Sequence, residues 1–352
     1  MKKIIIILLL PFTLLSQNIE EIFNNKNEIY FSFKYKNKQD LDRLSKIISL
    51  DHKIEKTTAY AYANKKQFVR FLELNIDFEL INNKVFYQNV SKSNWDYYPT
   101  YNQYVDMMYA FADSFPNICK VHSLGTLNSG REILIVNISD NVGQKENEPS
   151  FLYTSSMHGD ELTGYVLMLR FIDDILNNYN VNSRITNLVN EIDIWINPLA
   201  NPDGAYAGGN SNVWGATRSN ANFVDLNRNY PDPQDGPHPD GNSWQEETII
   251  FMGLADSINF NLASNLHTGA VVANYPWDTW SQLTADDSWW QHVCNEYADT
   301  CQFYGPNNYF TNYNDGIING YDWYEVDGGR QDYMNYFKHC REFTLELSND
   351  KT

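Results

Sequence analysis

His158 and Glu161 lie directly after the apolar run 150–155, with two residues between them. At the end of a strand, both side chains could turn towards one point. Catalytic zinc typically takes three protein ligands, and two His plus one Glu is a recurring set. His267 is the best third ligand because it also ends an apolar run, 260–266. These residues predict a zinc site built at the ends of two strands.

The remaining histidines fit such a site less well. A comparable position at a strand end is not expected for His122, His238, His292 or His339, and His52 lies in a separate N-terminal unit. A His-x-x-Glu spacing alone is a weak motif, and a loop histidine that caps the next helix is the alternative for His158.

The elements that would position these residues begin near Tyr101. Apolar patterning predicts helices over 101–115, 160–178 and 244–257, and strands over 132–139, 150–155, 192–196, 260–266 and 343–347. Strands that alternate with helices predict an α/β fold with a mixed, mostly parallel sheet and helices on both faces. In such sheets, ligands bind beyond the carboxyl ends of the strands.

A smaller unit precedes this region. Residues 28–82 read as β-α-β-α-β, with strands over 28–35, 56–63 and 76–81 and helices over 39–50 and 65–74, which predicts a small α/β sandwich. We expect three parts: a signal peptide over 1–17, the small domain with its linker over 18–97, and the main domain over 98–352. Lys2 and Lys3 followed by the apolar run 4–15 are typical of an export signal.

Composition narrows the functional classes. The net charge of −18 argues against nucleic-acid binding, which needs clustered Lys and Arg. No apolar run reaches membrane length, because the N-terminal one is too short to span a bilayer. Cys119, Cys294, Cys301 and Cys340 show no Cys-x-x-Cys spacing, so we expect buried thiols or at most two structural disulfides.

Five segments in order resemble the zinc carboxypeptidase family, particularly its regulatory branch with carboxypeptidases D, E and N. The resemblance covers about seventy per cent of the chain, from Tyr98 onwards. Arg330 stands where Met is common, and Tyr230 where Phe is usual. The segments are 158–161 (HGDE), 201–204 (NPDG), 225–232 (DLNRNYPD), 265–267 (NLH) with 274–276 (NYP), and 319–324 (NGYDWY) with 328–333 (GGRQDY) and 344–347 (TLEL).

The resemblance implies a role for each matching residue. Arg228, with Asn227 and the Tyr324 hydroxyl, would bind the free C-terminal carboxylate of a peptide, a task suited to a planar guanidinium. Arg218 would stabilise the developing oxyanion. Glu346 would take a proton from water and pass it to the leaving amine. Arg131 resembles a subsite arginine.

Substrate preference is implied by two further matches. Asp278 and Gln331 resemble the regulatory branch, which removes C-terminal Lys or Arg, and an acidic group with an amide acceptor would favour a cationic side chain. The alternative for Asp278 is an ordinary turn residue after Pro276 and Trp277. The implied partners are peptides or proteins with a free C-terminus, hydrolysed outside the cytoplasm with one Zn²⁺ per chain.

Alternatives stay open at this point. The small domain is either a pro-segment that covers the site, a permanent accessory domain or a secretion aid. A zinc amidase acting on cell-wall peptides could use the same metal set, although Asp278 and Gln331 speak against it. An inactive peptide-binding homologue is the third reading. The short segment after Glu346 suggests a C-terminally truncated domain.

Overall fold

The computed structural model describes residues 19–351, apart from 21, 24–25, 82–94 and 96. The predicted signal peptide and most of the predicted linker lie outside the described residues. None of the described helices is long and apolar enough to cross a membrane. All four cysteines are free thiols, and three of them are buried, so the expectation of buried thiols is confirmed and the two disulfides do not form.

The large domain is built on an eight-stranded mixed sheet in the order β11-β10-β12-β9-β7-β8-β6-β5. The central pairings, β12 with β9, β9 with β7, and β7 with β8, are parallel, as is β10 with β11. Four of the seven pairings are therefore parallel, which confirms a mixed, mostly parallel sheet. The strands are Cys119–Thr126 (β5), Glu132–Ile138 (β6), Ser150–Ser155 (β7), Asp193–Asn197 (β8), Leu262–His267 (β9), Ala270–Tyr275 (β10), Ile317–Asn319 (β11) and Arg341–Ser348 (β12).

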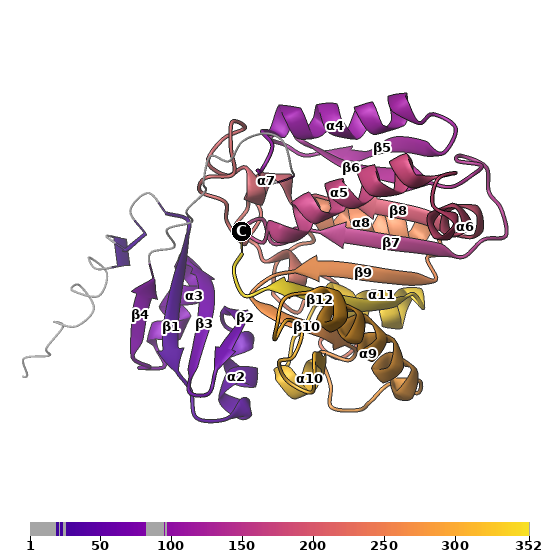
Figure 1. Ribbon diagram of the computed structural model, residues 1–352. Coiled ribbons are helices and arrows are strands. Elements are labelled where there is room, and N and C mark those ends of the chain that lie inside the picture. Colours follow the sequence, from indigo (N-terminus) through magenta and orange to yellow (C-terminus); the bar gives the residue numbers. More distant parts are fainter. Residues whose placement is uncertain (1–18, 21, 24–25, 82–94, 96, 352) are drawn as a thin grey trace, which may run out of the picture.

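Helices cover both faces of this sheet, as Figure 1 shows. Alternate residues of β6 face opposite sides: Leu134, Val136 and Ile138 pack with α4, α5, α6 and α9, whereas Ile133 and Ile135 pack with α8 and α11. The main helices are Tyr101–Ser114 (α4), Thr163–Asn178 (α5), Ser183–Glu191 (α6), Glu246–Ser257 (α8), Asp287–Tyr304 (α9) and Arg330–Lys338 (α11), with short turns at Pro202–Ala205 (α7), Leu226–Arg228 (η1) and Gly320–Trp323 (α10).

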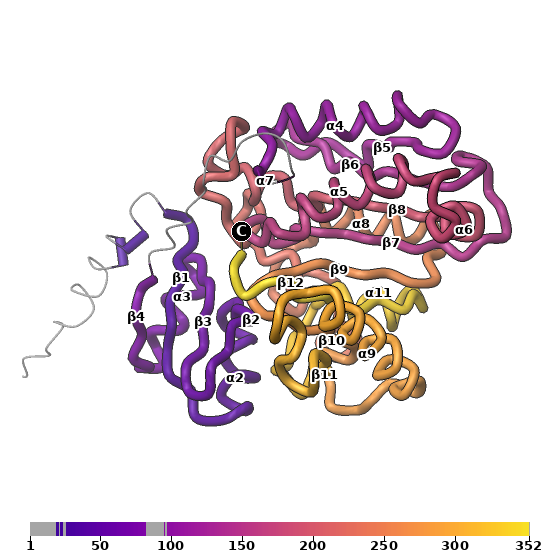
Figure 2. The backbone as a smooth tube through the Cα atoms, viewed as in Figure 1, coloured from indigo at the N-terminus to yellow at the C-terminus, as the bar shows by residue number. Residues whose placement is uncertain are grey.

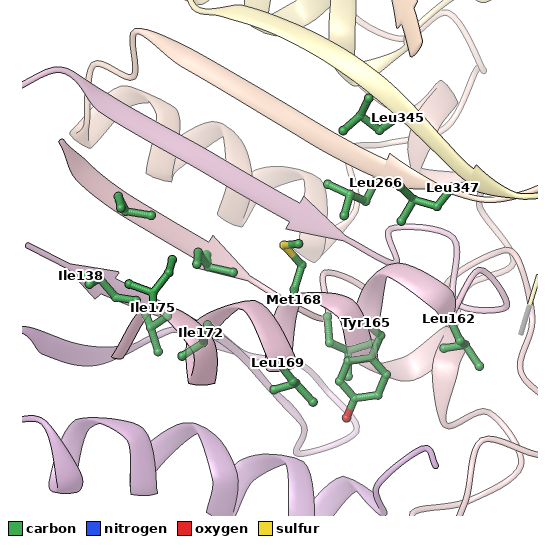
Figure 3. Close-up of a cluster of buried hydrophobic side chains, with 14 of the residues drawn as sticks. Ile138, Leu162, Tyr165, Met168, Leu169, Ile172, Ile175, Leu266, Leu345 and Leu347 are labelled. Atoms are coloured by element: carbon green, nitrogen blue, oxygen red, sulfur yellow. The ribbon is translucent and has the colours of Figure 1, made fainter. Parts of the chain in front are cut away.

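Helix α5 lies at the centre of the larger core. Its Tyr165, Leu169 and Ile172 are fully buried and face strand residues such as Leu266 and Leu345 (Figure 3). Its first turn starts at Thr163 rather than at residue 160, because residues 156–162 form a turn in which the Ser156 hydroxyl donates to the Glu161 carbonyl at 2.7 Å. This turn carries the His-x-x-Glu motif and anchors it between β7 and a rigid helix.

The N-terminal domain is a four-stranded antiparallel sheet in the order β2-β3-β1-β4 with two helices. Asn37 and Asn64 cap the two helices by accepting backbone N–H groups, which fixes where each begins. The elements are Glu28–Lys34 (β1), Lys38–Ser45 (α2), Ser49–Glu55 (β2), Thr58–Asn64 (β3), Lys65–Leu72 (α3) and Phe78–Ile81 (β4).

The predicted order of this domain is wrong in one place. Residues 39–50 were expected to be one helix, but α2 ends at Ser45 and a strand, β2, begins at Ser49. Ile47 and Ile48 continue the helical spacing of Leu41 and Leu44, yet they lie in the turn and bend between α2 and β2. The unit is therefore β-α-β-β-α-β, and the missed strand contains His52.

The two domains share one hydrophobic cluster. Phe31 and Phe71 of the small domain pack in the same buried group as Val272 of β10 and Trp323 and Tyr324 of α10 and its end. Figures 1 and 2 show the small domain beside the carboxyl ends of β7 and β9, next to the C-terminal end of the chain. It therefore lies over the edge at which the sequence predicts the metal site.

Candidate metal centre and substrate site

The three predicted metal ligands converge at the carboxyl ends of β7 and β9. His158 Nδ1 lies 3.0 Å from Glu161 Oε1, and His267 Nδ1 lies 2.9 Å from Glu161 Oε2. The two histidine Nδ1 atoms are 3.1 Å apart. All three side chains are completely buried. Two imidazole nitrogens and a carboxylate facing one point are the donors that catalytic zinc prefers, so these residues fit the ion.

Each histidine has a polar partner on its outer nitrogen. His158 Nε2 lies 3.1 Å from Asp225 Oδ1, and His267 Nε2 lies 2.9 Å from the Asn265 side-chain nitrogen. Such outer partners orient ligating imidazoles and set their tautomer. Asp225 belongs to the motif at 225–232, but the sequence did not single it out as a functional residue. Its position behind His158 explains why the motif begins with an acid.

Arg218 bridges the proposed ligand Glu161 and Asp225, the partner of His158. Its Nη1 lies 3.2 Å from Glu161 Oε1 and its Nε lies 3.0 Å from Asp225 Oδ2, while its Nη2 finds no hydrogen-bond partner among the described residues. Burial alone would raise the pKa of Glu161, but His158, Lys351 and His267 hold it well below its usual range. Glu161 is thus a carboxylate, the form that binds a metal ion.

Glu346 lies on β12 beside the ligands, because it pairs with His267 of β9 in the parallel register. It is fully buried; its Oε2 has no hydrogen-bond partner within the part of the chain that the structure describes, and its Oε1 lies 2.5 Å from His52 Nδ1 of the small domain. Burial raises the pKa of Glu346 to about 8. A buried carboxyl with a raised pKa beside a metal site is typical of a group that exchanges protons with a substrate or water.

Arg228 and Tyr324 present unused donors to the same region. Arg228 Nη1 donates to the Asn227 carbonyl at 2.7 Å, but Arg228 Nε and Nη2 and the Tyr324 hydroxyl have no hydrogen-bond partner in the described chain. All three atoms are buried. Since leaving a buried donor unpaired costs about 1–3 kcal/mol, such a group calls for an explanation, and a bound carboxylate would satisfy all three.

Tyr324 and Glu346 line a small pocket together with Asp278. His52, Asn227, Asp278, Tyr324 and Glu346 are among the residues that line a cavity of about 20 Å³, room for roughly one water molecule. The lining as a whole comprises His52, Asn227, Asn274, Asp278, Gly320, Trp323, Tyr324, Val326, Thr344 and Glu346. The side chain of a substrate does not fit into this volume while His52 occupies one wall.

The predicted specificity residues meet at the base of this pocket. Gln331 Nε2 donates to Asp278 Oδ1 at 3.0 Å and to Asn274 Oδ1 at 2.8 Å, while its Oε1 is unpaired among the described residues. A Cβ added at Gly320 would lie 1.7 Å from Asp278 Oδ1, so only glycine leaves room for the carboxyl. Burial raises the pKa of Asp278 to about 7.

Arg131 and Asn227 differ from the other predicted substrate residues. The Arg131 guanidinium donates to Asp203 Oδ1 at 2.6 Å, to Asn210 Oδ1 at 2.9 Å and to the Tyr206 carbonyl at 2.9 Å. This arrangement favours a structural role for Arg131, and the subsite role of Arg131 stays a prediction.

Asn227 Oδ1 accepts a hydrogen bond from the Arg330 amide at 2.9 Å. This bond fixes the orientation of the Asn227 side chain towards the pocket that it lines.

The sequence missed two groups that lie at this centre. His52 reaches it from the small domain, with Nδ1 2.5 Å from Glu346 Oε1. Lys351 Nζ lies 3.1 Å from Glu161 Oε1 and 3.7 Å from Asp51 Oδ2. Spacing in the sequence could not reveal His52, because it lies more than a hundred residues before His158, the first predicted ligand. For His52, the one local signal is that Asp51 and His52 interrupt the alternation of a strand.

The fold and this site define a carboxypeptidase-like α/β domain with a candidate zinc centre. The family model for zinc carboxypeptidase matches residues 104–352, and the chain belongs to that family of metallocarboxypeptidases, which use one zinc ion. Human carboxypeptidase D is 38% identical over 260 residues, covering 67% of this chain and 18% of that relative. The human carboxypeptidase N catalytic chain is 37% identical over 289 residues, covering 71% of this chain and 62% of that relative. The chain therefore spans less than two thirds of the length of either relative.

Solved structures extend the comparison of the fold to the small domain. The carboxypeptidase A structure from Helicoverpa armigera superposes with a TM-score of 0.69 at 19% identity, over 92% of this chain and 88% of that chain. Residues 98–352 make up less than three quarters of the 352 residues. The structural likeness therefore includes part of the N-terminal domain as well as the sheet that carries the site.

Proposed function

We propose that this chain is a zinc-dependent carboxypeptidase that hydrolyses the C-terminal peptide bond of peptides or proteins and prefers a C-terminal Lys or Arg. One observation carries the proposal. Among the described residues, four of the buried polar atoms without a hydrogen-bond partner belong to groups that C-terminal hydrolysis needs: Arg228 Nε and Nη2, the Tyr324 hydroxyl and Glu346 Oε2. Glu346 and Tyr324 line one pocket, and Glu346 pairs with His267 on the neighbouring strand.

Each group has a defined task. His158, Glu161 and His267 would hold zinc, which when bound supplies a Lewis acid for the scissile carbonyl and lowers the pKa of water. Arg228 binds the substrate carboxylate through two N–H groups, with Tyr324 donating to the same carboxylate and Asn227 beside it.

Proton movement falls to Glu346. Its carboxylate takes a proton from the attacking water and delivers it to the leaving amine. The Nη2 group of Arg218, which has no partner among the described residues, stabilises negative charge that develops on the carbonyl oxygen. Glu161 and Asp225 fix the rest of that guanidinium, so Arg218 is oriented before a substrate arrives.

The preference for Lys or Arg rests on the pocket base. Asp278, which lines the pocket, and the buried Oε1 of Gln331, which has no partner among the described residues, offer two acceptors to a cationic side chain. A cell-wall amidase would need a different pocket at this point. Matched peptides that end in Arg or Phe, with and without a chelator, test both parts: we expect a higher kcat/KM on Arg and loss of activity with the chelator. Equal or reversed turnover of Arg and Phe peptides would contradict the preference.

The Glu346→Gln variant distinguishes an active enzyme from an inactive homologue. This variant should keep its zinc, measured by elemental analysis, and lose at least about a hundredfold in kcat, the typical contribution of a general base. Unchanged kcat would remove Glu346 from the mechanism, and absence of zinc from the unaltered chain would favour the binding-protein alternative.

We further propose that residues 18–97 are a pro-segment and that residues 1–17 direct export. Polar contacts support the covering role: Glu28 Oε1 accepts from the Arg218 amide at 3.1 Å, and the Tyr62 hydroxyl donates to Asp160 Oδ2 at 2.7 Å. A protease site inserted within 84–94 of the full chain allows activity to be measured before and after cutting. Activity that rises on cutting supports a pro-segment, and unchanged activity supports an accessory domain. The N-terminal sequence of exported protein tests removal of residues 1–17.

A further inference from the structure

Strand β2 loses its regular pairing at the point where it meets the metal centre. It pairs with β3 at Ser49 and Leu50 and again at Ile54 and Glu55, with a register shift between Leu50 and Ile54. A bulge of this kind re-aims side chains and is frequent beside functional sites. Ser49, Leu50, Asp51 and His52 are all buried in succession, so this part of the strand is covered on both faces.

The bulge places the imidazole of His52 among the metal ligands. Its ring centroid lies 5.6 Å from that of His267 and 6.3 Å from that of His158. One ring nitrogen of His52, one nitrogen of His267 and one carboxylate oxygen of Glu161 all lie within 4.8 Å of one another. These three atoms form a possible metal-binding group in their own right.

The His52 ring is held there by packing and by a contact with Glu346. It lies against Trp323, at 5.2 Å between centroids, and against Tyr324, at 6.1 Å. Its Nδ1 lies 2.5 Å from Glu346 Oε1, so a carboxylate faces one nitrogen of the ring. A buried imidazole that a carboxylate orients and that lies beside two proposed metal ligands is positioned as a ligand.

We propose that His52 is the fourth protein ligand of the zinc ion in the intact chain, an inference that rests on the proposed zinc-peptidase function. A catalytic zinc site has three protein ligands and an open position for water or substrate, whereas a site with four protein ligands is closed. His52 would thus convert an open centre into a closed one. It also leaves only about 20 Å³ in the cavity between itself, Tyr324 and Glu346, which excludes a substrate residue.

A His52–zinc bond differs from simple steric covering of the site, because the small domain would be bound to the rest of the chain through the metal. Glu28 of β1 and Tyr62 of β3 also hold the domain in place by their contacts to Arg218 and Asp160. Release of the domain would then require exchange of one zinc ligand, and the vacated position would become available to substrate. Metal occupancy and domain docking would stabilise each other.

The test counts imidazoles on zinc by X-ray absorption in the full-length protein. We expect three imidazoles in the unaltered chain and two in His52→Asn, with zinc released to a chelator at least about tenfold faster in the variant. Tyr62→Phe removes the hydrogen bond to Asp160 but keeps the imidazole, so it should still show three. His292→Asn, at an exposed side chain, is the surface control.

Each outcome is decisive. Two imidazoles in the unaltered, zinc-loaded chain would overturn the ligand role of His52 and leave the proposed function intact. Zinc release that is equally fast in the unaltered chain and in His52→Asn would also overturn it. If the full chain and all variants bind no zinc, both the proposed function and this inference fail. The count in the unaltered chain needs no substitution, so a variant that misfolds does not remove the test.

Discussion

Arg228→Lys tests whether the unpaired guanidinium atoms bind the substrate carboxylate. Lysine keeps the positive charge but offers a compact ammonium, so it cannot make two parallel bonds from a planar fork. The structure shows two Arg228 nitrogens, Nε and Nη2, without partners among the described residues. A hydrogen bond to a charged group contributes about 1.5–3 kcal/mol, and lysine would retain roughly one of the two. At 1.36 kcal/mol for each tenfold change, we expect kcat/KM to fall by about 10- to 150-fold.

The assay compares a peptide with a free C-terminus and the same peptide with an amidated C-terminus, after the small domain has been cut away. Arg228→Lys should lower kcat/KM for the free acid and hardly affect the amide. Arg131→Lys is a matched control, because the Arg131 guanidinium is engaged with Asp203, Asn210 and Tyr206. It should lower the melting temperature and leave the ratio between acid and amide unchanged. An unchanged ratio in Arg228→Lys would refute the clamp, and a changed ratio in Arg131→Lys would restore the subsite role of Arg131.

Four further predictions concern the pocket and the domain interface. Asp278→Asn should lower kcat/KM on C-terminal Arg by about 10- to 100-fold, as loss of a charged acceptor implies, with little effect on Phe. Because burial raises the pKa of Asp278 to about 7, KM for Arg peptides should rise as the pH falls below 7, and the Asn variant should not show this dependence. Gly320→Ala should lower the melting temperature and the Arg preference together, since its Cβ would lie 1.7 Å from Asp278 Oδ1. Burial also raises the pKa of Glu28 from 4.5 to about 7, so the bound domain favours the neutral carboxyl. The contribution of Glu28 to binding of the small domain is therefore complete below pH 4.5 and is lost as the pH rises through about 7. The cut domain should dissociate faster at pH 8 than at pH 5, and Glu28→Gln should remove this difference, as followed by size-exclusion chromatography.

The zinc ligands could be predicted because local sequence places them. His158 and Glu161 follow one apolar strand and His267 ends another, and parallel strands bring their carboxyl ends to one edge of the sheet. Register then sets Glu346 beside His267, but no pattern in the sequence fixes that pairing. The resemblance to a family supplied the roles of Arg228, Tyr324 and Asp278, which spacing alone would have left as surface charges or turn residues.

His52 could not be predicted for a physical reason. The helical spacing of Leu41, Leu44, Ile47 and Ile48 continues up to the start of the following strand, so a local pattern extends the helix to residue 50 and hides β2. Ile48 and Leu50 are buried in a cluster that contains residues of both domains. The spacing of apolar residues reflects burial of one face of an element. It therefore does not identify the element correctly where two domains bury both of its faces.

Tyr324 links the docking of the small domain to the chemistry of the site. Its ring is buried in the cluster that contains Phe31 and Phe71 of the small domain, and its hydroxyl faces the pocket without a partner among the described residues. Departure of the domain would expose part of this ring to water and would give a substrate carboxylate access to the hydroxyl. A C-terminal residue that enters the pocket would bury the ring again. Substrate and small domain would then compete for the same apolar surface as well as for the same position on zinc, so each should weaken the binding of the other.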